Sequence, residues 1–242
     1  MCYYEIMRRG FVVGNYVHIF NRGNRQLPIV YDDSDKWRFL KVLRYFNDEY
    51  SPQNIFRELE KLINSGKCDH FKWPKFWPSH KPLVKILSYC LVSNHFHLLL
   101  KEIIKGGISK FMRKLGDGFT KYINTKYQEV GRIFQGPYKE KIIIGDPKNL
   151  HYLDAYIQVF NVFELYPGGI QIALREFNKA FEFALNYPFS SLGESFGIRK
   201  LDIIERDILK ETFPNLKIYK EFVYDALLVR NVREILGKLA IE

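Results

Sequence analysis

Two strongly apolar runs, residues 83–92 and 95–101, are separated only by Ser93-Asn94. A two-residue connection of this kind is typical of a β-hairpin, so the runs are predicted to pair as antiparallel strands. The first run is apolar at most positions, which indicates that one face of the sheet is buried. The chain is therefore expected to fold around a sheet that contains this hairpin.

The segments before and after the hairpin predict the rest of the fold. A strand and a helix precede it, and a helix, a strand and a further helix follow it, at 16–21, 34–47, 107–127, 139–144 and 148–165. Ser34 or Asp35 can cap the first of these helices. The order strand, helix, strand, strand, helix, strand is that of the ferredoxin-like split βαβ arrangement. The predicted fold class is α+β: a central antiparallel sheet of four or five strands, with helices on one face and the last helix across the open face.

One domain with an appendage accounts for the length of 242 residues. Residues 1–192 are predicted to form the main domain, and residues 193–242 a helical C-terminal extension. Residues 51–82 are predicted to be an insertion, because they combine one short amphipathic helix with a run of Trp-Pro pairs. Helical spacing in the tail covers 171–185, 202–211 and 218–239.

The three cysteines, Cys2, Cys68 and Cys90, have the spacing of neither a zinc site nor a disulfide framework. Residues 1–10 lack the apolar core of a secretion signal, and no window is apolar for long enough to span a membrane. These features predict a cytoplasmic protein with reduced thiols.

The charge balance predicts a polyanionic partner. The chain carries 37 Lys and Arg against 27 Asp and Glu, a net charge of +10, and basic side chains release the counterions condensed on phosphates. Aromatic residues alternate with basic ones around the predicted sheet edge, and aromatic rings stack on unpaired bases while cations follow the backbone. The predicted DNA-binding residues are Arg22, Arg25, Arg113, Lys114, Lys121, Arg132, Tyr138 and Lys139.

His95 and His97 lie two residues apart in the second strand of the hairpin. Side chains at i and i+2 of a strand point to the same face, so both imidazoles emerge together while Phe96 points into the core. Two neutral imidazoles side by side suit a divalent metal, although two surface histidines would give the same pattern. The pair therefore predicts a metal site only in combination with other signals.

A tyrosine on the helix 148–165, Tyr156, is a candidate nucleophile. A phenol is a poor nucleophile at neutral pH because its pKa is about 10, and it needs less activation beside a metal-polarised phosphate. Tyr122 and Tyr127 are rival candidates, because they also lie on a helix next to the sheet. A tyrosine half packed into a core would show the same pattern.

Several motifs occur together in the order found in one family. Residues 93–99, Ser-Asn-His-Phe-His-Leu-Leu, resemble the HUH motif of single-tyrosine transposases, in particular the REP-associated branch. Other segments resemble this family's first strand and turn, first helix, glycine-containing loop, tyrosine helix and Tyr-Pro-aromatic-Ser-Ser segment, at 16–24, 35–43, 131–139, 156–161 and 187–191. The resemblance covers residues 14–192 and identifies the domain 1–192 as the catalytic one. Pro137 replaces the loop's usual arginine, so a phosphate contact is lost or supplied by Lys139.

The resemblance implies a mechanism. In this family the histidine pair and a helix amide bind Mg²⁺ or Mn²⁺, and the metal polarises a phosphate of single-stranded DNA. The tyrosine attacks and leaves a 5′-phosphotyrosine link and a free 3′-hydroxyl. Carried over to this chain, His95 and His97 are metal ligands and Tyr156 is the nucleophile. The resemblance also implies a substrate strand with a hairpin beside the cleavage site, and a monomer or homodimer as the active form.

The third metal ligand departs from the family's pattern. The family usually places Asn or Gln four residues after the tyrosine, but that position is Phe160 here. In an α-helix Asn161, five residues after Tyr156, points about 140° away from it. A one-residue π-bulge would bring Asn161 onto the tyrosine's face, and such bulges often occur at functional sites. Asn161 is therefore the predicted third ligand, with Gln158, a water or a degenerate site as the alternatives.

Two other functions also fit the sequence. The shift of the amide from position 160 to position 161 also fits a DNA-binding module that has lost catalysis, and metal-dependent cleavage of a labelled single strand would distinguish the two. A generic RNA-binding ferredoxin-like domain would carry stacking aromatics on its central strands, where this chain has His95 and His97. The leading prediction is a transposase that cleaves and rejoins single-stranded DNA.

Overall fold

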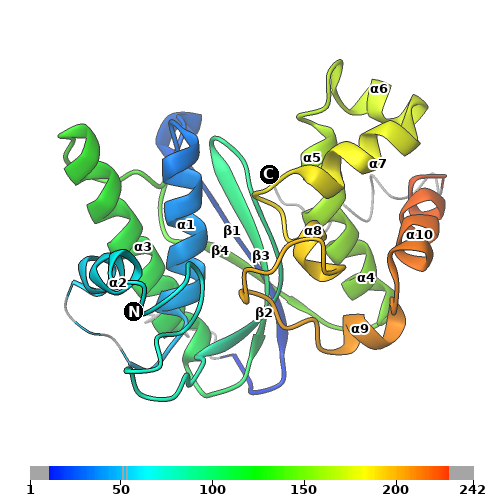
Figure 1. Ribbon diagram of the computed structural model, residues 1–242. Coiled ribbons are helices and arrows are strands. Elements are labelled where there is room, and N and C mark those ends of the chain that lie inside the picture. Colours follow the sequence, from blue (N-terminus) through cyan, green and yellow to red (C-terminus); the bar gives the residue numbers. More distant parts are fainter. Residues whose placement is uncertain (1–10, 51, 53, 229–242) are drawn as a thin grey trace, which may run out of the picture.

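Four antiparallel strands form the centre of the computed structural model, which describes residues 11–50, 52 and 54–228 (Figure 1). The strand order is β2-β3-β1-β4. The bounds are Tyr16–Arg22 for β1, Val84–Leu91 for β2, His95–Glu102 for β3 and Lys139–Ile143 for β4. β3 lies between β1 and β2, and every pair of neighbours is antiparallel. This is the split βαβ arrangement, so the predicted α+β fold class is confirmed.

The helices form a layer on each side of the sheet (Figure 1). The first layer contains α1 (Asp33–Phe46), α2 (Ile55–Asn64) and α3 (Gly107–Tyr127). The second layer contains α4 (Lys148–Ala155), η2 (Tyr156–Phe160), α5 (Asn161–Phe163), α6 (Gly169–Arg175), α7 (Phe177–Asn186), α8 (Leu192–Ser195), α9 (Ile208–Thr212) and α10 (Leu216–Leu228). A short 3-10 turn, η1 (Asn24–Gln26), follows β1. The tyrosine helix thus crosses the second face as predicted, and helices of the tail cover that face as well.

Alternation along the strands divides the buried side chains between two cores. The first core, under α1 and α3, contains the even-numbered residues of β3: Phe96, Leu98 and Leu100. Leu99 belongs to the second core, under α4, η2 and α7. Successive side chains of a strand point to opposite faces, so a shift of one residue would exchange the two cores. His95 and His97 share the parity of Leu99 and therefore face the second layer.

The start of α1 is fixed by a capping box. The Asp32 side chain accepts a hydrogen bond from the N–H of Asp35 at 2.9 Å, and the Asp35 carboxylate accepts one from the N–H of Asp32. Asp32 is therefore the N-cap, and the predicted cap at Ser34 or Asp35 is wrong by two or three residues. The reason is that Asp35 is the acidic partner at the third position of the same box.

The described part of the insertion 51–82 packs against α1. The ring of Tyr45 contacts those of Trp73 and Trp77, and Arg44 Nε donates to the carbonyl of Phe71 at 3.1 Å. These contacts place the insertion in the first layer, on the far side of the sheet from the histidine pair.

The predicted helix 171–185 is divided into α6 and α7. The chain bends at Glu176, where φ is −105° and ψ is 38°. The Glu176 carboxylate accepts a hydrogen bond from the hydroxyl of Tyr166 at 2.9 Å. A tertiary contact to the preceding turn thus holds a bend that helical spacing alone does not predict.

The prediction of a helix at 202–211 is wrong over residues 202–207. There the N–H of Glu205 donates to the carbonyl of Ile86 on the edge strand β2 at 2.8 Å, so the edge of the sheet competes with helix formation. Of the predicted helix 218–239, residues 218–228 belong to α10 and residues 229–239 lie outside the described residues. Among the described residues, no helix combines the length and apolar character needed to cross a bilayer.

Candidate active site

His95 and His97 line a pocket of about 620 Å³ on the second face of the sheet, called here the histidine pocket. Both come from the first three residues of β3, and their ring centroids are 5.1 Å apart. Phe96 between them is buried in the first core. The predicted division of these three side chains between the two faces is therefore confirmed. His97 is 6% exposed and His95 is half-buried, so His97 is the deeper of the two.

The helix that carries Tyr156 changes to a π-helical turn at Tyr156–Phe160. Hydrogen bonds of a π-helix join residues five apart, and the N–H of Asn161 donates to the carbonyl of Tyr156. The Asn161 side chain reinforces this turn, since its Nδ2 donates to the same carbonyl at 2.9 Å. Tyr156 and Asn161 consequently both line the histidine pocket, which is the arrangement expected of a π-bulge.

Tyr156 lies on the same side of the sheet as the histidine pair. Its ring stands edge-on to that of His97, with the centroids 5.3 Å apart. Tyr156 is half-buried and Asn161 is buried. The pocket that these side chains share with His95 has a volume typical of small-ligand sites.

Gln158 anchors the π-turn from its opposite side. Its Nε2 donates to both carboxylate oxygens of Asp154 at 2.7 Å. Its Oε1 accepts from the hydroxyls of Ser191 at 3.0 Å and Ser195 at 2.8 Å. The hydroxyl of Ser190 donates to the Gln158 carbonyl at 2.9 Å. Gln158 is absent from the lining of the histidine pocket, so this geometry does not favour it as the third ligand.

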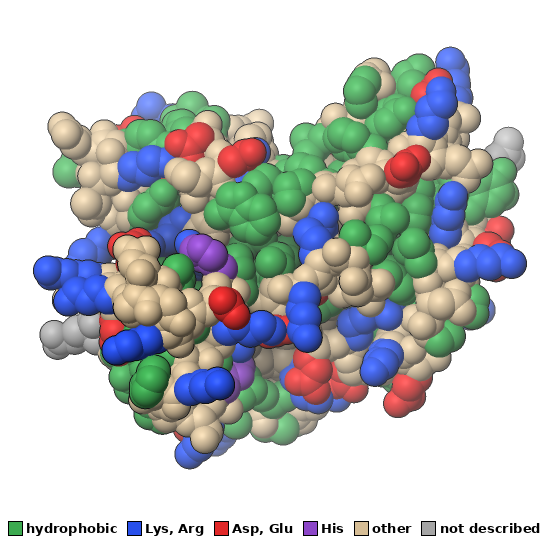
Figure 2. All heavy atoms as spheres, in the orientation of Figure 1, with side chains coloured by type: hydrophobic (Ala, Val, Ile, Leu, Met, Phe, Trp, Pro, Cys, Tyr) green, Lys and Arg blue, Asp and Glu red, His purple; other side chains and the backbone are tan. Residues whose placement is uncertain are grey.

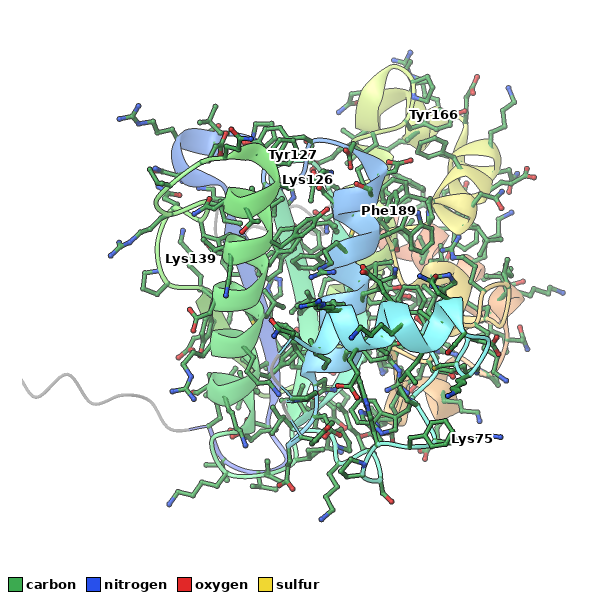
Figure 3. All side chains as sticks on the ribbon, turned by 60° about the vertical axis from the view of Figure 1, so that its left-hand side comes forward. Lys75, Lys126, Tyr127, Lys139, Tyr166 and Phe189 are labelled. Atoms are coloured by element: carbon green, nitrogen blue, oxygen red, sulfur yellow. The ribbon has the colours of Figure 1, made fainter. Side chains whose placement is uncertain are left out.

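The rival tyrosines, Tyr122 and Tyr127, belong to the first layer. Figure 3 shows Tyr127 and Lys126 together at the last turn of α3. The hydroxyls of Tyr122 and Tyr127 donate to the Asp35 carboxylate at 2.9 and 2.8 Å, and Lys126 Nζ lies 2.7 Å from the same carboxylate. These side chains connect α3 to the start of α1, and neither tyrosine lines the histidine pocket.

Burial holds the pKa of His97 well below its ordinary value, and the neighbouring His18 and His95 lower it further. His97 is therefore neutral at neutral pH, the form that offers a lone pair to a metal. His95 Nδ1 lies 2.7 Å from the side-chain oxygen of Asn94. An amide oxygen only accepts hydrogen bonds, so Nδ1 carries the proton and Nε2 the lone pair when this ring is neutral.

The side chains that could hold a divalent metal are those of His95, His97 and Asn161. The Asn161 amide nitrogen bonds to the Tyr156 carbonyl, so the amide oxygen is the atom of this side chain that could bind a metal. Two imidazole nitrogens and one oxygen form a mixed donor set that fits a divalent ion with further oxygen ligands. No three His, Cys, Asp or Glu side chains gather into a metal cluster among residues 11–50, 52 and 54–228.

Two of the predicted DNA-binding residues, Arg22 and Lys139, line the histidine pocket. Arg22 Nε donates to the side-chain oxygen of Gln135. Lys139 is exposed, and its Nζ lies 5.7 Å from the centre of the Phe20 ring. A cation and a half-buried aromatic ring therefore stand together beside the histidines.

Two others, Lys121 and Arg132, line a neighbouring pocket of about 520 Å³. Gly136 and Pro137 belong to the lining of both pockets. The two hollows thus adjoin at the loop 131–138, with basic side chains in each. This arrangement suits a charged polymer that follows the surface from one to the other.

The remaining four predicted DNA-binding residues lie outside both pockets. Arg25 is exposed in η1, and Arg113 is exposed on α3. Lys114 donates to the carbonyl of Asp48 at 2.7 Å, and burial lowers its pKa to about 8. Tyr138 is half-buried against the first core. Basic side chains are spread over the face seen in Figure 2 among acidic and uncharged ones, so charge alone does not mark the site.

The loop 131–138 is fastened to the end of β1. The N–H of Gln135 donates to the carbonyl of Arg22 at 2.9 Å, and Asn21 Nδ2 donates to the carbonyl of Gly136 at 3.0 Å. Gly23 pairs with Phe134 in an isolated bridge, and a Cβ on Gly23 would collide with the carbonyl oxygen of residue 27. A glycine is therefore required at the turn that places this loop at the rim of both pockets.

Several side chains near the site were not predicted from the sequence, among them those of Phe20, Glu164 and His18. Phe20 and Glu164 line the histidine pocket, and His18 is buried with its Nε2 2.9 Å from Nδ1 of His97. Alternation along 16–22 places His18 and Phe20 on the same face as Arg22, so the sequence carried a signal for both. Glu164 follows Asn161 by about one helical turn, and its position depends on the π-turn.

Residues 79–159 match a family model described as "Transposase IS200 like". The predicted resemblance to single-tyrosine transposases is thereby confirmed over this segment, which contains His95, His97 and Tyr156. No curated protein matches the chain. Among solved structures, the chain is similar to one described as "Structure of the REP associates tyrosine transposase bound to a REP hairpin". The identity is 14% and the TM-score 0.47, over 84% of this chain and 90% of that chain. This likeness is weak, so a functional assignment depends on the pocket itself.

Proposed function

We propose that this chain, which matches the IS200-like transposases over residues 79–159, is a DNA transposase that cleaves and rejoins single strands through a bond to Tyr156. The observation that carries the proposal is the π-turn. It turns Tyr156 and Asn161 toward one pocket, which is also lined by His95 and His97. A regular α-helix would point the amide about 140° away from the phenol.

In the proposed first step, the phenol oxygen of Tyr156 attacks a phosphate of the DNA strand. A bond forms between this oxygen and phosphorus, while the bond from phosphorus to the 3′-oxygen of the preceding nucleotide breaks. The phenol proton passes to solvent and the departing 3′-oxygen takes up a proton. The products are a 5′-phosphotyrosine and a free 3′-hydroxyl. Attack by the 3′-hydroxyl of another strand reverses the step and reseals the DNA without net hydrolysis.

The chain's own side chains prepare this step by position and charge. A divalent ion, Mg²⁺ or Mn²⁺, held by His95, His97 and Asn161 would draw negative charge from the attacked phosphate. The packing of the Tyr156 ring edge-on to His97 holds the nucleophile beside these ligands, so that little reorientation is needed before attack. The neutral state of His97 supports its role as a ligand.

The DNA strand is proposed to run from the histidine pocket to the neighbouring pocket. Arg22 and Lys139 would bind phosphates next to the cleaved bond, and Phe20 would stack on an unpaired base. Lys121 and Arg132 would hold the backbone further along. The family resemblance implies a hairpin beside the cleavage site, so the proposed substrate carries one.

Covalent capture tests the proposal. The protein is incubated with a 3′-end-labelled library of single strands, with and without a flanking hairpin, in Mg²⁺ or Mn²⁺, and then separated under denaturing conditions. Wild-type protein should acquire the label, and Tyr156→Phe or EDTA should abolish it. Tyr152→Phe is a matched control on the preceding helix, since the Tyr152 ring packs against Phe222 with centroids 5.4 Å apart. Tyr127→Phe is the control in the first layer, and both should keep the adduct.

Three outcomes would contradict parts of this proposal. A labelled adduct in Tyr156→Phe would transfer the nucleophile's role to another tyrosine. An adduct of equal yield in EDTA would exclude the metal's role. Binding of the strands by wild-type protein with no adduct under any condition would support a DNA-binding module without catalysis.

A further inference from the structure

His18 is a fully buried histidine that contacts a proposed metal ligand. It lies on β1 with 0% exposure, and its Nε2 is 2.9 Å from Nδ1 of His97. The two rings meet edge to edge and are nearly coplanar, with centroids 5.1 Å apart and an angle of 20° between the planes. His18 also meets the ring of Tyr156 edge-on at a centroid distance of 6.4 Å. It does not line the histidine pocket, so its effect on the site passes through its neighbours.

The direction of the hydrogen bond between the two rings determines what His97 can bind. Each neutral imidazole has one N–H and one lone pair. If His97 Nδ1 donates, the His97 lone pair is on Nε2, the nitrogen on the other side of the ring from His18. If His18 Nε2 donates, the His97 proton is on Nε2 and that nitrogen cannot bind a metal. A metal at Nε2 of His97 therefore requires His18 to accept the bond and to carry its own proton on Nδ1.

The other histidine of the pair shows the same arrangement with a different acceptor. His95 Nδ1 is paired with the side-chain oxygen of Asn94 at 2.7 Å, so both proposed ligands have Nδ1 engaged by a neighbour. Histidine ligands in proteins usually donate their second ring N–H to an acceptor that fixes the tautomer and the ring orientation. For His97 the structure offers His18 in that place.

We propose that His18 is a positioning residue that accepts the Nδ1 proton of His97 and thereby fixes the tautomer and orientation in which His97 binds a divalent metal through Nε2. The inference rests on the proposed function, because it assumes a metal at the histidine pair. It adds a residue from β1, outside the matched segment 79–159, to the machinery of that site. The ring stack of His18 with Phe20, at a centroid distance of 4.9 Å, limits rotation of the acceptor.

Two substitutions distinguish the role of His18 as a hydrogen-bond acceptor from its role in filling space. His18→Gln keeps a side-chain oxygen that can accept the His97 proton, whereas His18→Leu fills a similar volume and cannot accept. Affinity for Mn²⁺ without DNA is measured by electron paramagnetic resonance of the free ion. His18→Leu should bind Mn²⁺ roughly 10- to 100-fold more weakly than wild type, the range typical for loss of a ligand's partner, and His18→Gln should recover most of that loss.

Two further measurements distinguish positioning from a general role in folding. Nitrogen-15 NMR of the metal-free wild type should show the His97 ring protonated at Nδ1, and His18→Leu should lose that preference. Thermal unfolding identifies a variant that does not fold, and affinity for a single strand in EDTA should be the same in wild type, His18→Gln and His18→Leu.

The failure of this inference can be told from the failure of the proposed function. Wild-type protein that does not bind Mn²⁺ at all would overturn the metal site and this inference with it. Wild-type binding that is retained in folded His18→Leu would overturn only the role of His18. A wild-type His97 protonated at Nε2 would overturn that role even if the leucine variant cannot be purified.

Discussion

The two faces of the sheet bury polar side chains in different ways. On the face under α1 and α3, the buried side chains of Asn47 and Glu102 bond to the backbone. The Asn47 side chain donates to the carbonyl of Val84 and accepts from the N–H groups of Leu83 and Val84, at 2.8 to 3.1 Å. The Glu102 carboxylate accepts from two N–H groups at the start of α3, at 2.7 and 2.8 Å. These side chains fix where elements begin and end.

On the face under α4 and η2, buried polar side chains bond mainly to one another. His18 pairs with His97, and Gln158 joins Asp154 to serines of the segment 190–195. Hydroxyl and amide groups here connect elements that are distant in the sequence. The histidine pocket opens on this face.

The two faces differ in what their buried polar side chains can do for stability and for chemistry. A polar group that bonds to the backbone holds a helix or strand in place, and its hydrogen-bonding capacity is then used up. A group held by other side chains can be oriented toward a ligand, provided that hydrogen bonds from its neighbours fix its position. Because both faces belong to the same four strands, the first core supplies a rigid support for the residues of the pocket.

The largest difference in Mn²⁺ affinity is expected between variants of two buried amides, one on each face. Asn161→Leu should weaken Mn²⁺ binding by at least about 100-fold, since replacing even the partners of metal ligands costs roughly 10- to 100-fold. Asn47→Leu leaves backbone groups of Leu83 and Val84 unpaired, at about 1–3 kcal/mol each. It should lower the free energy of unfolding and leave Mn²⁺ affinity unchanged.

Urea unfolding and Mn²⁺ titration of both variants measure this contrast. Equal loss of Mn²⁺ affinity in folded Asn47→Leu and Asn161→Leu would show that the two faces are not separable. Unchanged Mn²⁺ affinity in Asn161→Leu would remove Asn161 from the ligand set.

A smaller contrast is expected between two buried carboxyls, because their pKa values move in opposite directions. Burial raises the pKa of Asp154 from its ordinary value of 3.8 to about 6, and hydrogen bonds from neighbours including Tyr219 and Gln158 offset only part of this. The folded state then binds the proton more tightly than the unfolded chain. Stability should fall as pH rises from about 4 to about 6, by roughly 3 kcal/mol. Asp154→Asn should abolish that slope.

Asp35, on the other face, should change stability with pH in the opposite direction. Burial acts to raise the pKa of Asp35, but hydrogen bonds from Lys126, the N–H of Tyr31 and Tyr127 outweigh it, and the pKa is lowered. Its contribution to stability is present above the ordinary carboxyl pKa and is lost as pH falls through the lowered value. Unfolding of wild type, Asp154→Asn and Asp35→Asn across acidic pH measures both effects. An unchanged slope between pH about 4 and about 6 in Asp154→Asn would contradict the assignment.

The smallest difference is expected in the salt dependence of DNA binding, between variants of two lysines on α3. Lys121 is exposed in the pocket next to the loop 131–138, whereas Lys114 is bonded to the carbonyl of Asp48. Lys121→Met should reduce the slope of log affinity against log salt concentration by about 0.7, the value for one phosphate contact on a single strand. Lys114→Met should change stability and leave the slope unchanged. Fluorescence anisotropy with a labelled strand at several salt concentrations gives both slopes, and a reversed order would remove the neighbouring pocket from the DNA path.

Local patterns predicted those parts of the molecule that local rules control. Period-two alternation in β3 predicted which faces His95, Phe96 and His97 occupy, and the range of α3 was predicted to the residue. The position of an amide at residue 161 and not 160 predicted the π-turn, since only that turn aligns it with Tyr156.

Long-range contacts control the parts that were missed. Residues 202–207 are not helical because the N–H of Glu205 bonds to the edge of β2. The connection of His18 to His97 depends on the pairing of β1 with β3 across 79 positions of the chain. Lys114 resembles any other basic residue of a helix until its contact with Asp48 is known. No periodicity within one segment carries such information.

The π-helical turn in η2 changes how this helix should be aligned with others. An alignment that counts positions in steps of four finds Phe160 where an amide is expected and would classify the chain as inactive. An alignment that follows the hydrogen bonds pairs Asn161 with Tyr156, since its amide donates to the Tyr156 carbonyl. Chains dismissed as defective copies on the basis of spacing alone should therefore be re-examined for an inserted residue between the phenol and the next amide.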